Sequence, residues 1–417
     1  MKKLLLLIAM CAPARERGGT LDRAPDVRPL LALHRVPMSR LLGDEGFWSP
    51  PYFFAGPCPA GYGWQQAYTV ASSQITGTLV NFPVTVPLQN NNWKLSAGYV
   101  TNANNYDSIW VNAAGTALPF ELVGHGTSST TWDGTAGNAE FWINVDSIAV
   151  GTVIYNCMGK GSISTYQGND SGTWDSNFVG VWHAQNGTTL ASPVPDSTSH
   201  ALAGAWHNSP TVQTGKVGGA FGTTVAGANW LTAPSYALTS GAFTFSLWAA
   251  HTAAVDDGGV WNMSLTSTSG ASFGITTAGN ANDWLNGDML CFGNGYNSGR
   301  TPRAAAAHPV YADYAWHYYT CRLDASNASI WYDGAAVTMR VSTPGSVPSN
   351  THVFTLADNA GANEYLDEIR FSNNIRSDAW VAAEYHNSVA PATFWTIGSL
   401  QPTTAAAAIR HRVIGGE

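Results

Sequence analysis

Short strand-like segments separated by turns recur along most of this chain. Residues 243–248 read FTFSLW, with an apolar side chain at almost every second position. This period is the one expected of a strand with one buried face. Other strand-like segments are separated by Gly, Asn and Pro, which favour turns. The spacing predicts an all-β protein built from antiparallel sandwiches or barrels.

The composition is that of an ordered protein with few charges. Charged residues make up 11% of the 417 residues, whereas an average globular protein has about 25%. The 17 Trp, 16 Tyr and 15 Phe need burial or a binding role, which excludes a disordered chain. The net charge is −8 and the middle of the chain has no run of Lys or Arg, which argues against nucleic acid as a partner.

The N-terminus has the pattern of a secretion signal. Lys2 and Lys3 precede the apolar run 4–10, and an A-x-A cleavage pattern stands at 12–14. The run is too short to span a bilayer, which takes about 20 residues, and no other segment is a transmembrane candidate. We therefore expect a signal peptide at 1–14, an irregular leader at 15–57 and a flexible tail at 401–417.

Five cysteines are present, and none forms a C-x-x-C pair, which disfavours a thiolate zinc site. If Cys11 leaves with the signal peptide, Cys58, Cys157, Cys291 and Cys321 remain. These four could form two disulfides in an oxidising compartment, or stay as buried thiols. In the disulfide alternative, Cys291 and Cys321 are expected on neighbouring strands, and Cys58 and Cys157 bracket the first predicted domain.

The first domain, predicted at 58–177, contains a series of motifs. They are WQQAYTV at 64–70, NFPV at 81–84, YDSIW at 106–110, EFWINV at 140–145 and VIYNCMG at 153–159. The series resembles an uncharacterised bacterial β-domain that commonly precedes laminin-G-like domains. The resemblance implies a β-sandwich and brings no catalytic residues with it.

The second domain, predicted at 178–400, contains a longer series. It comprises VWH at 181–183, DS at 196–197, GKVGGAF at 215–221, FSLW at 245–248, WH at 316–317, WYDG at 331–334 and LDEIR at 366–370. The series resembles the laminin-G-like, concanavalin A-like lectin/glucanase family, which implies a jelly roll of two stacked antiparallel sheets. Near its end, Ser377 is expected to cap a helix over 378–385, and a strand is expected over 394–398.

Three acidic residues near the end of the second domain come nearest to a catalytic set. The concanavalin A-like fold also hosts glycoside hydrolases, which need two carboxylates facing one cleft. On a regular strand, Glu364 and Glu368 share one face and Asp367 lies on the other. The alternating carboxylates of such hydrolases are therefore absent, and no G-x-S-x-G elbow is present. We predict that the protein is not an enzyme.

Calcium is the metal that the second resemblance suggests, since some laminin-G-like domains bind it at a sandwich rim. Asp196 is the preferred donor among several loop acids, although no Asp-x-Asp-x-Asp loop supports it. His183, His200 and His207 fit no metal motif, and we interpret them as structural or surface residues.

Aromatic residues in polar loops suggest carbohydrate binding. Sugars stack their C–H faces on aromatic rings, while Asn, Asp and Gly groups bind the hydroxyls. The candidate ligand contacts are Asn282, Asp283, Trp284, Trp230 and Tyr296, and Trp284 has polar neighbours in its loop. The alternative is that these rings belong to the sandwich cores.

These features predict an extracellular glycan-binding or adhesion protein, secreted or held at the cell surface. Its expected partner is a glycan or another extracellular polymer. One alternative is a phage tail fibre or a virion decoration or receptor-recognition protein, which uses the same jelly rolls and needs no signal peptide. A second alternative is a glycoside hydrolase on the concanavalin A-like fold.

Overall fold

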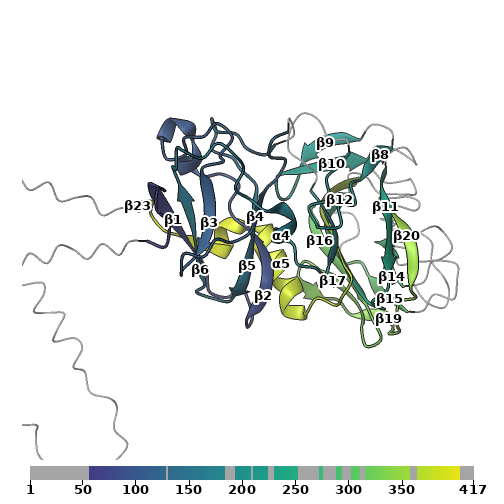
Figure 1. Ribbon diagram of the computed structural model, residues 1–417. Coiled ribbons are helices and arrows are strands. Elements are labelled where there is room, and N and C mark those ends of the chain that lie inside the picture. Colours follow the sequence, from purple (N-terminus) through teal and green to yellow (C-terminus); the bar gives the residue numbers. More distant parts are fainter. Residues whose placement is uncertain are drawn as a thin grey trace, which may run out of the picture. The chain divides into compact units, whose positions relative to one another are not determined.

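Antiparallel strands account for most of the regular structure (Figure 1). The computed structural model describes residues 56–127, 130–183, 193–207, 210–223, 230–251, 272–275, 288–293, 302–309, 315–356 and 364–403. The predicted signal peptide, nearly all of the predicted leader, and the tail beyond residue 403 lie outside these ranges. The predicted all-β fold class is confirmed. Among the described residues, no helix has the length and apolar character needed to cross a membrane.

Two small sheets share the first core. One has the order β22-β1-β6-β3, with β23 also paired to β1, and the other has the order β2-β5-β4. The strands are β1 (Trp64–Val70), β2 (Leu79–Thr85), β3 (Ser108–Asn112), β4 (Phe120–Leu122), β5 (Phe141–Ile148), β6 (Val153–Met158), β22 (Trp395–Ile397) and β23 (Gln401–Pro402). Trp110 of β3 and Phe141 of β5 are fully buried and meet edge to face, with ring centroids 5.6 Å apart.

The largest sheet has eight strands, in the order β18-β17-β16-β12-β21-β10-β9, with β7 also paired to β21. Its strands are β7 (Phe178–Trp182), β9 (Thr211–Thr214), β10 (Gly219–Thr223), β12 (Phe243–His251), β16 (His317–Leu323), β17 (Ala328–Tyr332), β18 (Ala335–Ala336) and β21 (Glu364–Ser372). The alternating segment 243–248 lies in β12, and Phe243, Phe245 and Leu247 point into the second core.

Two smaller sheets contribute the other side of the second core. Their orders are β20-β11-β8 and β13-β14-β15-β19. The strands are β8 (Ala205–His207), β11 (Trp230–Leu238), β13 (Ser272–Ile275), β14 (Asp288–Phe292), β15 (Arg303–Ala307), β19 (Met339–Thr343) and β20 (Asn350–Leu356). Leu231 of β11 and Met289 of β14 are buried in the same core as Leu247 of β12. Stacked sheets around one apolar core are the arrangement of a β-sandwich.

The Cys291–Cys321 disulfide crosses the second core. Cys291 lies in β14 and Cys321 in β16, which belong to different sheets, and both side chains are buried. The bond is present, but the expectation that these cysteines lie on neighbouring strands is wrong. A disulfide needs Cα atoms roughly 4.4–6.8 Å apart, and inward-facing positions of the two sheets meet this requirement with a separation of 6.0 Å.

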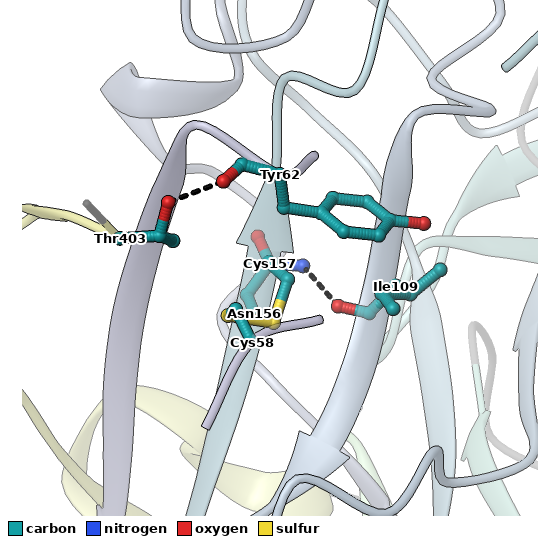
Figure 2. The surroundings of a disulfide bond; sticks show 6 residues. All are labelled: Cys58, Tyr62, Ile109, Asn156, Cys157 and Thr403. Carbon is teal, nitrogen blue, oxygen red and sulfur yellow. Dashed lines mark hydrogen bonds between the residues drawn. A yellow bond between two sulfur atoms is a disulfide. The ribbon is translucent and has the colours of Figure 1, made fainter. Parts of the chain in front are cut away.

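The Cys58–Cys157 disulfide ties the segment before β1 to β6 (Figure 2). It joins cysteines 99 positions apart in the sequence, with Cα atoms 5.6 Å apart. Beside it, the Asn156 side chain donates a hydrogen bond to the Ile109 carbonyl of β3 at 3.2 Å. The Thr403 hydroxyl donates to the Tyr62 carbonyl. The start and the end of the described chain therefore meet beside this disulfide.

The C-terminal segment packs back on the first core. Short helices are η2 (Asn91–Trp93), η3 (Leu95–Ala97), α4 (Asp170–Thr173) and α6 (Pro391–Phe394), and the long one is α5 (Asp378–Val389). Ser377 caps α5 as expected, by accepting a hydrogen bond from the Trp380 backbone N–H. Trp380 lies edge to face on Phe82 of β2, with ring centroids 4.7 Å apart. Residues from both predicted domains thus share the first core, and the domain boundary at 177/178 stays a prediction.

We expect loss of the Cys291–Cys321 disulfide to lower the free energy of unfolding. The bond joins residues 30 positions apart, and in the chain-entropy model a loop of that length contributes about 3–4 kcal/mol. The Cys291→Ala/Cys321→Ala double variant should therefore unfold at a lower urea concentration than the wild type. Peptide mapping without reductant should show both disulfides in the wild type, and four free thiols in exported protein would contradict this.

Candidate functional site

A β-bulge in β21 places charged residues together on one side of the largest sheet. Between the pairs Ser246–Arg370 and Trp248–Asp367, β21 has two residues where β12 has one. One of the two, Glu368, adopts a φ of 50°, in the left-handed region that such residues seldom occupy. As a result, Asp367, Glu368 and Arg370 all lie away from the second core.

The expectation that Asp367 and Glu368 lie on opposite faces is therefore wrong. Regular alternation would separate them, but one extra residue shifts the alternation by one position. Leu366 and Ile369 on either side of the pair both belong to the second core. Glu368 instead contacts His183, which lies on the side of the first core.

His183 lies at the centre of a buried group of charged side chains. It follows β7, and its side chain is 4% exposed. Its Nδ1 lies 2.6 Å from Oε1 of Glu368 and 3.7 Å from Oε1 of Glu140. Its Nε2 lies 3.4 Å from Oε2 of Glu121. Because Glu121 belongs to β4 and Glu140 directly precedes β5, this group joins a small sheet to the largest one.

Indole and hydroxyl donors hold two of these carboxylates in place. Trp174 Nε1 donates to Oε2 of Glu121 at 3.0 Å, and the Ser197 hydroxyl donates to Oε1 at 2.6 Å. Trp142 Nε1 donates to Oε1 of Glu140 at 3.1 Å. Buried carboxylates are tolerated when such partners replace water.

Arg370 adds a buried positive charge to the group. Its Nη2 lies 2.8 Å from Oε2 of Glu368, and its Nη1 lies 3.3 Å from Oε1 of Glu384 on α5. The guanidinium lies over the rings of Trp142 and Trp174, at 4.2 and 5.2 Å from their centroids. Cation–π contact of this kind is favourable where water is excluded. The arginine thus links β21 to α5.

Burial and neighbouring charge set the protonation of the group. Burial alone would lower the pKa of His183, but Glu368 and Glu121 outweigh it and raise that pKa well above its usual value. Burial would raise the pKa of Glu368, but His183 and Arg370 hold it below its usual value. Burial and the adjacent Glu368 raise the pKa of Glu140 well above its usual value. The environment therefore favours the charged forms of His183 and Glu368 and the neutral form of Glu140.

The same group contains atoms of the kind that bind metal ions. Among the described residues, Glu140, His183 and Glu368 place three such atoms within 4.8 Å of one another. A cavity of about 120 Å³ adjoins His183 and Glu121. Small-molecule sites usually measure roughly 300–1,000 Å³, so this cavity suits water or an ion and is too small for a sugar ring.

A larger, open pocket lies among loops of the first predicted domain. Its volume is about 380 Å³, and its lining comprises Asn104, Tyr106, His125, Gly126, Thr127, Thr130 and Trp132. Two aromatic rings, an imidazole, an amide and three hydroxyls therefore form its described walls. None of these lining residues is Asp or Glu, so the pocket offers binding groups without a carboxylate pair.

Contacts behind the pocket wall hold its rings in position. Trp132 Nε1 donates to the Ala103 carbonyl at 2.7 Å. His125 stacks on Tyr166 with ring centroids 3.5 Å apart, and its Nε2 lies 2.9 Å from Oδ2 of Asp170. The Tyr166 hydroxyl donates to Oδ1 of Asp170 at 2.8 Å. Rings that are held before binding lose less conformational freedom when a ligand arrives.

Asp196, the predicted calcium donor, organises a loop. Its Oδ1 accepts hydrogen bonds from the backbone N–H groups of Val181 and Thr198. Its Oδ2 accepts from the Thr198 hydroxyl and from the Leu202 backbone N–H. Both carboxylate oxygens therefore already have partners within the protein. Calcium binding by Asp196 stays a prediction.

Most of the predicted sugar contacts fall outside the described residues, namely Asn282, Asp283, Trp284 and Tyr296. Trp230 begins β11, where its backbone pairs with His207. The ligand-binding role of these residues stays a prediction.

The sequence-based interpretation missed four members of the buried group, which are Glu121, Glu140, Arg370 and Glu384. Charged residues are only 11% of this chain. Glu121, Glu140 and Arg370 stand next to apolar and aromatic residues in segments with the pattern of strands. Such residues are rarely buried unless they are paired. A charged residue inside an apolar strand was therefore the available sign of a buried, paired side chain. That sign does not identify the partner.

Comparison with known proteins agrees with the architecture of the largest sheet and its partners. Residues 225–382 match the family model of the concanavalin A-like lectin/glucanases superfamily. This segment is similar to concanavalin A-like domains. The match begins after the first small sheets and ends inside α5, so the resemblance of 58–177 to an uncharacterised β-domain stays a prediction. No curated protein matches the chain.

Several solved structures are similar to part of this chain. The binding domain of botulinum neurotoxin DC in complex with rat synaptotagmin II has 10% identity and a TM-score of 0.41, covering 51% of this chain and 52% of that one. The same domain in complex with SialylT has 10% identity and a TM-score of 0.40, covering 51% of this chain and 52% of that one. The binding domain of Paraclostridial Mosquitocidal Protein 1 has 10% identity and a TM-score of 0.39, covering 50% of this chain and 52% of that one. The chain thus spans about half of each, and likenesses this weak carry no inference about a ligand.

Removing the charge of Arg370 should destabilise the protein strongly. The Arg370→Met variant leaves Glu368 and Glu384 without their buried partner, and breaking such a group costs about 3–5 kcal/mol. Urea unfolding of the variant measures this loss. The Arg370→Met/Glu368→Gln double variant should recover part of it, because one unpaired charge is removed with its partner. If the losses in unfolding free energy of Arg370→Met and Glu368→Gln simply add up in the double variant, the two side chains are not coupled.

Stability should fall as the pH rises above about 6.5, the unfolded-state pKa of histidine. The pKa of His183 is raised in the folded protein, so its contribution is fully present below that pH and is lost as the pH rises through the folded-state value. The raised pKa of Glu140 acts in the same direction. Calorimetric melting temperatures between about pH 6 and 9, measured with EDTA, test this. The His207→Gln variant should keep the slope, and a melting temperature that rises over this interval would contradict the assignment.

Proposed function

We propose that this is an extracellular glycan-binding protein without catalytic activity. The observation that carries the proposal is the open pocket at Tyr106, His125 and Trp132. Carbohydrate sites combine aromatic faces with amide and hydroxyl groups at the sugar hydroxyls. This pocket has both kinds of group, and its volume of about 380 Å³ suits one or two sugar rings.

The position of the acidic residues supports binding instead of hydrolysis. Glycoside hydrolases flank the bound sugar with two carboxylates. In the described part of this chain, Glu121, Glu140 and Glu368 lie close together but are at most 7% exposed. The adjoining cavity of about 120 Å³ leaves no room for a sugar ring between them.

The two disulfides support an extracellular location. Disulfides persist in oxidising compartments and are rare in the cytosol. Cys58–Cys157 and Cys291–Cys321 each sit within one of the two cores, where they are part of the folded structure. Secretion itself remains part of the proposal.

Truncation of Trp132 should weaken glycan binding. A glycan array of defined oligosaccharides identifies a ligand, and isothermal titration calorimetry then measures its affinity for wild type and variants. We expect the Trp132→Ala variant to lose about tenfold in affinity, or about 1.4 kcal/mol, because a stacking face is removed. The Trp132→Phe variant should keep most of the affinity.

Two further variants separate the alternatives. The matched control is Trp316→Ala, which removes a half-buried tryptophan from the second core and should leave affinity unchanged. Trp284→Ala tests the ligand contact predicted in the second domain. An array without any binder would overturn the proposed function, and release of reducing sugar from a polysaccharide panel would overturn its non-catalytic part.

A further inference from the structure

We propose that Glu140, His183 and Glu368 form a binding site for a divalent transition-metal ion of the Zn²⁺ type. The site lies at the junction of β4, β5, β7 and β21, and the cavity beside it shares His125 and Thr127 with the glycan pocket. It goes beyond the proposed function, because a metal ion here would join sheets to one another.

The three ligand atoms are already close to the spacing that a metal ion requires. They are one carboxylate oxygen each from Glu140 and Glu368 and one ring nitrogen of His183, all within 4.8 Å of one another. Zinc binds nitrogen and oxygen at about 2.0–2.2 Å, which places tetrahedral ligands about 3.3–3.6 Å apart. The distance of 3.7 Å between Oε1 of Glu140 and Nδ1 of His183 is just above this range. The contact of 2.6 Å between His183 and Glu368 would open slightly as the ion replaces the shared proton.

An unpartnered carboxylate oxygen points to a missing ligand. Glu140 is 1% exposed, and its single hydrogen bond comes from Trp142 to Oε1. Its Oε2 is buried and has no hydrogen-bond partner within the described structure. A buried polar atom of this kind is costly and calls for an explanation. A bound cation would satisfy this carboxylate.

The partners of the ligands are those that metal-binding side chains usually have. A metal-bound histidine commonly presents its second ring nitrogen to a carboxylate. Here Nε2 of His183 faces Oε2 of Glu121 at 3.4 Å, and Trp174 and Ser197 hold that glutamate. Of the two carboxylate oxygens of Glu368, Oε2 binds Arg370 and Oε1 faces the imidazole of His183.

The charges around the site also favour a cation. Five carboxylates gather around one arginine and one histidine, and the seven residues are Glu121, Glu140, Asp367, Glu368, Glu384, His183 and Arg370. An excess of buried negative charge must be relieved by protonation or by a bound ion. The cavity beside His183 and Glu121 holds space for water next to the imidazole.

The ligand set distinguishes between metals. Imidazole with carboxylates suits Zn²⁺ and similar transition ions. Ca²⁺ takes six to eight oxygen ligands and does not use imidazole. The site should therefore bind Zn²⁺ in preference to Ca²⁺.

The test uses the full chain, stripped with EDTA and desalted. After incubation with ZnCl₂ and a second desalting, elemental analysis should find one equivalent of zinc per chain, and the melting temperature should rise. CaCl₂ should leave the melting temperature unchanged. Substitution with Co²⁺ should give visible d–d absorption, which reports direct ligation. Wild-type protein that retains no zinc and shows no Co²⁺ absorption would overturn the proposal.

Matched variants locate the ion. Glu140→Gln keeps the side-chain shape and an oxygen for Trp142, so its melting temperature in EDTA should stay near that of the wild type while zinc retention is lost. The control is Asp146→Asn, an exposed position in the same strand β5, which should bind zinc like the wild type. Zinc that stays bound to Glu140→Gln would place the ion elsewhere and overturn the site. Should Glu140→Gln not fold, the Co²⁺ spectrum of the wild type decides.

Discussion

The bulge at Glu368 is the constraint on which the interior of this protein depends. An unbroken strand would direct either Asp367 or Glu368 into an apolar core. With one extra residue, Leu366 and Ile369 stay in the second core while Asp367, Glu368 and Arg370 share the opposite face. That face meets α5 and the small sheet β2-β5-β4. The charges of this group therefore lie among indole rings and polar donors instead of aliphatic side chains.

This buried group does more for specificity than for stability. Removing an ion from water costs several kcal/mol, and pairing returns that energy only when the geometry is good. The group requires Glu121 of β4, His183 after β7 and Glu384 of α5 to reach one place together. We interpret it as a device that admits one arrangement of these three elements, because any other would leave a charge unpaired.

Local patterns predicted local structure well. Alternation at 243–248 predicted β12, and Ser377 predicted the start of α5. The prediction that Asp367 and Glu368 lie on opposite faces was wrong because it assumed that side chains alternate without interruption along the strand. Nothing in the sequence marks the extra residue of the bulge. The contact of Glu121 with His183, and the meeting of two cysteines from different sheets, depend on how distant elements approach one another. No local pattern records that approach, so the site could not be assembled from the sequence.

The pairing of β22 with β1 has a consequence for how the chain is made. The Gln66 side chain donates a hydrogen bond to the Gly398 carbonyl, across 332 positions of sequence. At a synthesis rate of about 5–20 residues per second, these partners leave the ribosome roughly 20 to 70 seconds apart. For that time one side of β1 offers unpaired backbone groups to any passing strand. One side of β1 is therefore open to wrong pairing until the residues of β22, Trp395–Ile397, have been added.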